Sequence, residues 1–146
     1  MKYKQYAKRD AIKNYFPLPN AIFCLGLSAG EIAVYAYLMY CEDRKNFQCH
    51  PSYRTIGRAV GLSRNTVKKY VSSLEEKRLI FTEPTTVCTK EGEKRNGSLL
   101  YTIRPIEEVK EHCFDQQLQR AEEESVQHKT RKLLEWRSQE QKRKVV

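Results

Sequence analysis

The sequence has no long apolar run and no pattern that directs export. Its longest apolar stretch, residues 32–41, is about half of the roughly 20 residues that a helix needs to cross a bilayer. The first ten residues carry four basic side chains with no apolar run behind them, unlike a secretory signal peptide. We therefore expect a soluble, cytoplasmic protein with no membrane partner.

Paired cysteine motifs are also lacking. None of the five cysteines stands in a C-x-x-C pair, and an odd number without an export signal indicates reduced thiols. Small buried side chains are the commonest use of such cysteines. A metal- or thiol-sensing repressor stays open as an alternative, because Cys49 and His50 are adjacent and Cys41 or Cys88 could join them. Otherwise we expect no metal and no cofactor.

Motifs of catalysis are absent too. The sequence has no H-E-x-x-H, no Gly-rich phosphate-binding loop and no nucleophile elbow. The histidines His50, His112 and His128 are scattered, and a His-Cys pair on a charged helix, as at 112–113, is more often incidental than nucleophilic. We expect no enzymatic activity.

Positive charge is in excess, at +9, but it is unevenly placed. Residues 1–26 (five basic, one acidic) and 62–104 (nine basic, five acidic) each have a net charge of +4. Residues 105–125 have two basic and seven acidic side chains, hence −5, and residues 126–146 have seven basic and two acidic, hence +5. Because clustered positive charge attracts polyanions, this distribution favours a nucleic acid as partner.

The length fits one small domain with appendages. We expect a basic arm over residues 1–15, a domain over 16–104, and a C-terminal helical extension with a basic tail over 105–146. Ser28 and Glu31 have the spacing of a capping box. The helix that they begin, to about residue 43, is apolar on most faces, which is typical of a central buried helix.

Two further helices are predicted after a polar, loop-like stretch over residues 44–50. A short helix begins at Ser52 and ends near Val60. Ser63 then caps a longer helix over residues 64–78, with apolar side chains at helical spacing.

The spacing of Gly57, Gly61 and Val67 is typical of a helix-turn-helix. Gly57 offers no side chain where two helices come close, and Gly61 suits the tight turn between them. Val67 fills the space from the second helix. In this geometry the first helix braces the second against the major groove of DNA.

The polar face of the second helix carries the candidate DNA-binding residues. With Val67, Val71 and Leu74 turned inward, basic and amide side chains point outward, and these donate to guanine edges or pair with adenine. Hydroxyls beside the positive end of a helix suit phosphate oxygens. An ordinary solvated face is the alternative. The candidates on and just before this helix are Ser52, Arg54, Ser63, Arg64, Asn65, Thr66, Lys68, Lys69 and Ser72.

Two strand-like runs follow, over residues 80–89 and 99–103, around a polar turn that contains glycine. A hairpin directly after the second helix forms a wing, whose tip we expect to touch the DNA backbone. An ordinary solvated turn stays open, because Glu91 and Glu93 dilute its charge. The candidates at the tip are Lys90, Lys94, Arg95 and Asn96. The predicted fold class is mainly α with a small β-hairpin, a winged helix-turn-helix plus a C-terminal helical extension.

Residues 63–80 (SRNTVKKYVSSLEEKRLI) resemble the recognition helix and first wing strand of bacterial winged-helix regulators, including the GntR-like group. With the start LSAGE at residues 27–31, the sequence is more similar still to helix-turn-helix proteins of phage and mobile elements, some of which organise replication. The resemblance covers about residues 16–104 and implies double-stranded DNA as partner. Arg78 stands where these proteins usually have glycine. About 40 residues after Pro105 are too few for the GntR-like ligand-binding domain.

The sequence therefore predicts a sequence-specific DNA-binding protein, most simply a transcriptional regulator. A replication initiator or organiser is the alternative within DNA binding. A winged helix used only for protein contacts, with the acidic helix over residues 107–125 as its docking surface, is the alternative of another class. An incomplete apolar stripe of Val109, Cys113, Leu118 and Ala121 suggests a homodimer through this helix. A solvated helix, or one packed on the domain, stays open.

Overall fold

The computed structural model describes residues 15–145, so the predicted basic arm lies outside the described residues except for Tyr15. The chain forms two units, which meet between Ile106 and Glu107 and are described separately. None of the helices over residues 15–145 combines the length and the apolar character that crossing a membrane requires.

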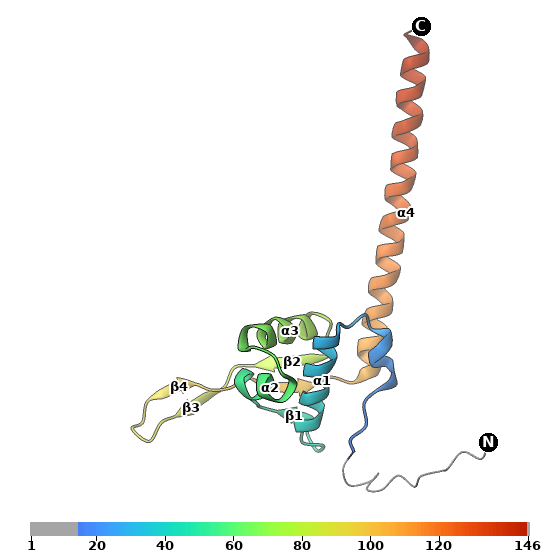
Figure 1. Cartoon of the computed structure of the whole chain (residues 1–146). Coiled ribbons are helices and arrows are strands. Elements are labelled where there is room, and N and C mark those ends of the chain that lie inside the picture. Colours follow the sequence, from blue (N-terminus) through green and yellow to red (C-terminus); the bar gives the residue numbers. More distant parts are fainter. Residues whose placement is uncertain (1–14, 146) are drawn as a thin grey trace, which may run out of the picture. The chain divides into compact units, whose positions relative to one another are not determined.

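The described part of the first unit has three α-helices, one short 3-10 helix and two small antiparallel sheets. One sheet has the strand order β1-β5-β2, and β3 and β4 form a separate two-stranded ribbon that extends away from the helices (Figure 1). With the C-terminal helix, this confirms the predicted fold class, a winged helix-turn-helix. The elements are η1 (Asn20–Cys24), α1 (Ala29–Cys41), β1 (Gln48–Cys49), α2 (Tyr53–Val60), α3 (Arg64–Glu76), β2 (Ile80–Glu83), β3 (Thr86–Cys88), β4 (Lys94–Asn96) and β5 (Leu100–Ile103).

The predicted capping box begins α1. Ser28 Oγ accepts a hydrogen bond from the Glu31 backbone N–H, and the Ser28 N–H donates to Glu31 Oε2, both at 3.3 Å. The helix ends at Cys41, slightly before the predicted end. Only one face of α1 is fully buried, whereas Tyr40 is 66% exposed. The expectation of a helix buried on most faces was therefore wrong, because the small domain has too few elements to surround it.

Glu31 also ties α1 to α3. It is the only buried charged side chain among the residues described. Its carboxylate accepts hydrogen bonds from Ser73 Oγ and from Lys77 Nζ, each at 2.7 Å. Burial favours the protonated carboxyl, but the bonds from Lys77, Ser73 and Ser28 outweigh burial and lower the pKa of Glu31 below its ordinary value.

The turn between α2 and α3 has the predicted geometry. A side chain at Gly57 would collide with the backbone carbonyl oxygen of Leu62, which explains the glycine. Gly61 has a φ of +74° and ends α2, with its N–H donating to the Gly57 carbonyl. Val67 is fully buried behind this turn. Local sequence therefore sets the orientation of α3 relative to α2.

The strands differ from the prediction in two ways. The stretch 44–50, expected to be a loop, contains β1, in which Gln48 lies opposite Thr102 of β5 and donates to its hydroxyl at 3.2 Å. The predicted hairpin is also divided, because β2 pairs with β5 in the main sheet and only β3 and β4 form the ribbon. The break falls at Pro84, which has no N–H to donate to a ladder.

The second unit begins at Glu107 and contains all but the first residue of the helix α4 (Ile106–Lys144), which has 39 residues. The predicted acidic helix thus continues through the basic tail, which is helical. Of the predicted stripe, Val109 is buried and Cys113 is partly buried, whereas Leu118 and Ala121 are exposed. Every residue from 114 to 139 is exposed.

Candidate nucleic-acid interface

The start of α3 is fixed by its cap and its buried face. Ser63 Oγ accepts from the Thr66 N–H at 3.3 Å, and the two hydroxyls lie 2.8 Å apart. Because Val67, Val71 and Leu74 are buried, the opposite face of α3 is turned to solvent. The predicted side chains on this exposed face are Arg64, Asn65, Lys68, Lys69 and Ser72.

The start of α2 repeats the same arrangement. Ser52 Oγ accepts from the Thr55 N–H at 3.1 Å, and the Ser52 and Thr55 hydroxyls lie 2.9 Å apart. Arg54 is exposed in the first turn of this helix. Each helix start has unpaired backbone N–H groups and the positive end of the helix dipole. Two such starts in one unit favour an anionic partner.

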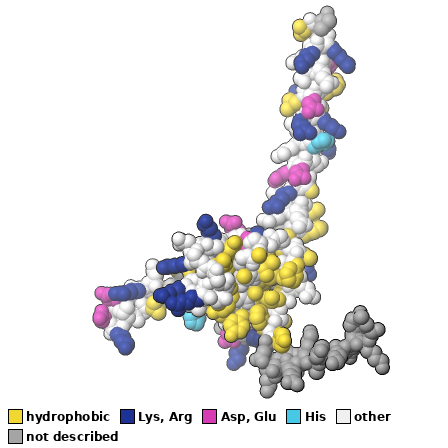
Figure 2. All heavy atoms as spheres, viewed as in Figure 1, with side chains coloured by type: hydrophobic (Ala, Val, Ile, Leu, Met, Phe, Trp, Pro, Cys, Tyr) yellow, Lys and Arg dark blue, Asp and Glu magenta, His cyan; other side chains and the backbone are white. Residues whose placement is uncertain are grey.

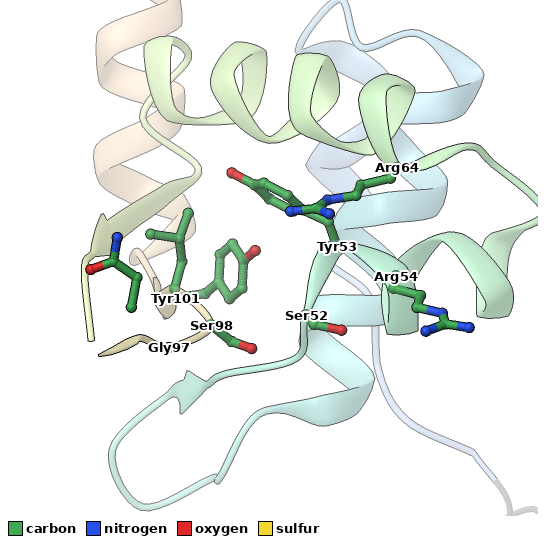
Figure 3. A pocket seen from close by; sticks show the side chains of 9 residues that line it. Ser52, Tyr53, Arg54, Arg64, Gly97, Ser98 and Tyr101 are labelled. Atoms are coloured by element: carbon green, nitrogen blue, oxygen red, sulfur yellow. The ribbon is translucent and has the colours of Figure 1, made fainter. Parts of the chain in front are cut away.

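A pocket of about 390 Å³ lies between the starts of α2 and α3 and the return from the ribbon into β5. Its lining includes Arg54 and Arg64 from the helices and Ser98 from the returning chain (Figure 3). The planar guanidinium of arginine can donate two parallel hydrogen bonds to the oxygens of one phosphate. The pocket therefore joins the starts of α2 and α3 to the wing by a surface that can accept a phosphate group.

Two tyrosines form the inner wall of this pocket. Tyr101 is fully buried, and burial raises the pKa of its hydroxyl. Its hydroxyl is one of two buried side-chain polar atoms without a hydrogen-bond partner in the described part of the chain. Figure 3 shows this hydroxyl turned toward Tyr53 and Arg64. Burial and the charge of Glu75 raise the pKa of Tyr53, so both tyrosines stay neutral hydrogen-bond donors at neutral pH.

The ribbon carries exposed basic side chains on β4. Lys94 and Arg95 lie on the strand itself rather than at the tip, which is a turn at residues 89–93 closed by a hydrogen bond from Thr89 N to Glu93 O. Arg95 pairs with the exposed Glu93 at 3.2 Å. Figure 2 shows Lys and Arg side chains on the ribbon and on the adjoining side of the first unit.

The structure thus brings part of the predicted site together. Ser52, Arg54 and Arg64 line the pocket, whereas Lys68, Lys69 and Ser72 lie further along α3. Tyr53 and Tyr101 also line the pocket, although neither was among the predicted site residues. Tyr53 could have been suspected, because it separates two predicted site residues. Tyr101 gave no such indication, since a tyrosine in an alternating strand is most simply a core residue.

The cysteines are less buried than expected. All five are free, Cys49 is buried, and Cys24 and Cys88 are exposed. The expectation that most of them fill the core was therefore wrong for this chain. Over residues 15–145, no three His, Cys, Asp or Glu side chains gather closely enough to hold a metal ion. Among these described residues, no group of side chains supports the metal-sensing alternative.

Residues 25–80 match the family model of a helix-turn-helix domain. No curated protein sequence matches the chain. Among solved structures, a possible transcriptional regulator from Methanosarcina mazei Go1 is similar over 70% of this chain and 79% of its own, with 17% identity and a TM-score of 0.46. A MarR-family transcriptional regulator from Silicibacter pomeroyi is similar over 65% of this chain and 57% of its own, with 15% identity and a TM-score of 0.39. The segment from Leu25 to Ile80, which contains α1, α2 and α3, is thus a helix-turn-helix domain.

Proposed function

We propose that the first unit binds double-stranded DNA in a sequence-specific way and acts as a transcriptional regulator in the cytoplasm. In this proposal α3 enters the major groove, and Asn65 and Lys68 on its exposed face contact base edges. The β3–β4 ribbon lies along the neighbouring backbone, where Lys94 and Arg95 meet phosphates. The observation that carries the proposal is the pocket, which joins both helix starts and the wing in one basic surface.

The pocket has a particular role in this proposal. A backbone phosphate enters between Arg54 and Arg64, where the N–H groups of both helix starts and the neutral tyrosine hydroxyls can donate to its oxygens. Such a contact carries no sequence information, but it fixes the register of α3 on the duplex. The base contacts of α3 depend on this register.

The test compares two arginines that line the pocket with one that does not. Arg54→Ala and Arg64→Ala should each weaken binding of the full chain to duplex DNA about 5- to 30-fold, in line with the loss of one charge-assisted contact of about 1–2 kcal/mol. Arg58→Ala is the matched control, because Arg58 is an exposed arginine of α2 outside the pocket lining. Fluorescence anisotropy with a labelled duplex measures all three. Equal losses of affinity for the three variants would show that the pocket arginines contribute only nonspecific positive charge. Unchanged affinity would show that the pocket does not contact DNA.

Replication initiation or organisation in a phage or mobile element is the alternative biological role, supported by the resemblance of residues 27–31 and 63–80. Mapping bound genomic fragments to promoters or to replication origins separates the two roles. We also propose that the chain is not an enzyme, because the lining of the pocket contains no His, Asp, Glu or Lys that could act as a general base for a nucleophile.

A contact module for another protein is the second candidate. It is favoured by an exposed aromatic cluster on the first unit, where the rings of Phe16 and Tyr40 lie 5.8 Å apart and those of Tyr37 and Tyr40 lie 5.9 Å apart. Exposed apolar patches often mark interaction sites. Failure of the chain to shift any duplex would favour this candidate.

We further propose that the protein is a homodimer through α4. Support comes from large apolar side chains that α4 leaves exposed, including Leu118 at 49% and Trp136 at 59%. Many helix-turn-helix proteins bind paired half-sites as dimers.

A further inference from the structure

The two halves of α4 carry equal net charges of opposite sign. Residues 106–125 carry seven acidic and two basic side chains, for a net charge of −5, and residues 126–144 carry two acidic and seven basic, for +5. The helix is neutral as a whole but strongly polarised along its axis. Two copies side by side attract when they run in opposite directions, because each acidic half then faces a basic half.

The helix dipole alone does not explain this distribution. Charges complement the dipole only within the first and last turns of a helix. Charged clusters also lie near the middle, with Glu122, Glu123 and Glu124 on one side of Ser125 and basic residues over 129–132 on the other. Charges placed there are too far from either end to complement the helix dipole.

An exposed apolar row runs along the same helix. Phe114 is 61% exposed, Leu118 49%, Leu133 60% and Trp136 59%. Steps of three or four residues place side chains on one face of a helix. Such steps connect these four apolar residues along one face, by way of Ala121, Ser125 and Lys129.

The apolar row and the charges select the same pairing. When Ser125 is placed opposite Ser125 of a second, antiparallel copy, Phe114 lies opposite Trp136, since each is eleven residues from the centre. Leu118 then lies beside Leu133. The acidic residues at 107–108 face the basic residues at 142–143 in this register. A parallel pair would instead place like charges opposite each other over the whole length, which is destabilising.

The ion pairs between residues of one α4 helix are too weak to replace the attraction between two antiparallel helices. Lys110 lies 3.0 Å from Glu107, Arg131 3.7 Å from Glu135, and Lys144 3.7 Å from Glu140. All of these are surface pairs one turn apart, and each contributes about 0.5 kcal/mol or less.

We propose that α4 pairs with α4 of a second copy in antiparallel orientation, centred on Ser125. The inference rests on the homodimer proposed above and specifies its orientation and register. It does not depend on DNA binding by the first unit, so the two can fail separately.

Charge reversal in the full-length chain tests the orientation. One variant changes Glu122, Glu123 and Glu124 to Lys, which makes both halves of its α4 positive. The matched variant changes Lys129, Arg131 and Lys132 to Glu, which makes both halves negative. Each variant alone should have a dimer dissociation constant at least tenfold above that of the wild type, and an equimolar mixture should associate. Analytical ultracentrifugation measures all four samples.

Other outcomes overturn the proposal. A first variant that stays dimeric alone, or a mixture that does not associate, contradicts antiparallel pairing. A monomeric wild type at tens of micromolar removes the homodimer as well, while binding of duplex DNA by the same sample would leave the proposed function intact. Circular dichroism checks that the variants keep their helix content.

A distance measurement distinguishes antiparallel from parallel pairing even if the charge-reversal variants lose the helical structure of α4. A spin label at Glu111→Cys should give a separation of about 42 Å in an antiparallel pair centred on Ser125, at about 1.5 Å per residue. A parallel pair would bring the two labels to roughly 10 Å between helix axes. Ser125→Cys is the control, with a short distance expected. The background replaces four cysteines by Ser, namely Cys24, Cys41, Cys88 and Cys113.

Discussion

At the scale of single residues, Arg78 is held in a conformation that its side chain disfavours. Its φ is +61°, in the left-handed region, directly after α3. Two hydrogen bonds fix this exit from the helix, from Arg78 N to Glu75 O and from Leu79 N to Leu74 O, both at 3.0 Å. The left-handed conformation costs a residue with a Cβ about 1–2 kcal/mol. Glycine, which similar proteins usually have here, avoids this cost.

Arg78→Gly should therefore stabilise the domain. Because Arg78 is exposed, its replacement removes few side-chain contacts. The greater conformational freedom of glycine in the unfolded chain offsets only part of the stability gained by relieving the left-handed conformation. We expect the free energy of unfolding to rise by about 0.5–1 kcal/mol. Arg78→Ala is the control and should leave it nearly unchanged, since alanine keeps the Cβ. Urea unfolding followed by circular dichroism measures both variants, and a glycine variant less stable than the alanine variant would contradict the expectation.

The cysteines should differ strongly in reactivity. Burial raises the pKa of the Cys49 thiol to about 12, and its Sγ donates to the Leu38 carbonyl oxygen at 3.5 Å. Because the thiolate is the reactive form, native protein at pH 8 should be alkylated at the exposed Cys24 and Cys88, with Cys49 protected until urea is added. Mass spectrometry of alkylated peptides measures this. Labelling of Cys49 as fast as Cys24 would support a thiol sensor instead.

At the scale of elements, Glu31 links the start of α1 to the end of α3. Its pKa is lowered in the folded state, so its stabilising contribution is complete above the ordinary glutamate pKa of about 4.3. That contribution is lost as the pH falls below this value through the lowered folded-state pKa. Part of the acid unfolding of the domain should therefore come from this carboxylate.

Glu31→Gln should lower the free energy of unfolding at pH 7 by about 1–3 kcal/mol, because Lys77 loses its charged partner and a buried network loses bonds. The variant should also lose less stability than the wild type between pH 5 and about pH 3. Glu76→Gln, at an exposed position of α3, is the control. Urea unfolding over this pH range measures both effects, and parallel pH profiles for wild type and Glu31→Gln would show that the carboxylate is not the titrating group.

The elements also show what the sequence could predict and what it could not. The caps at Ser28 and Ser63 and the turn at Gly61 were predicted because their geometry depends on residues within one turn of the chain. β1 was not, because a stretch as short as Gln48–Cys49 forms a strand only where β5 offers its free edge. The pocket was predicted only in part, since its lining joins the starts of two helices with the chain around Ser98, and sequence spacing does not report such proximity.

At the scale of the whole molecule, positive charge and helix pairing belong to different parts of the chain. The acidic and basic halves of α4 cancel, so the net charge of +9 equals the excess carried by residues 1–104. The counterions released on DNA binding should therefore come from contacts of the DNA-binding part. Antiparallel pairing of α4 would engage its basic half and keep that half from binding DNA without sequence preference.

In the proposed function, α3 recognises the base sequence while the wing contacts only the backbone. The most direct test is a salt titration of DNA affinity for Asn65→Ala, Lys68→Ala, Lys94→Ala and Arg95→Ala, on a selected duplex and on a scrambled one. Each α3 variant should lose about 1–3 kcal/mol on the selected duplex only. Each wing variant should lose affinity equally on both duplexes and reduce the salt slope by about 1. Equal losses on both duplexes for the α3 variants, or unchanged affinity for all four, would contradict the account.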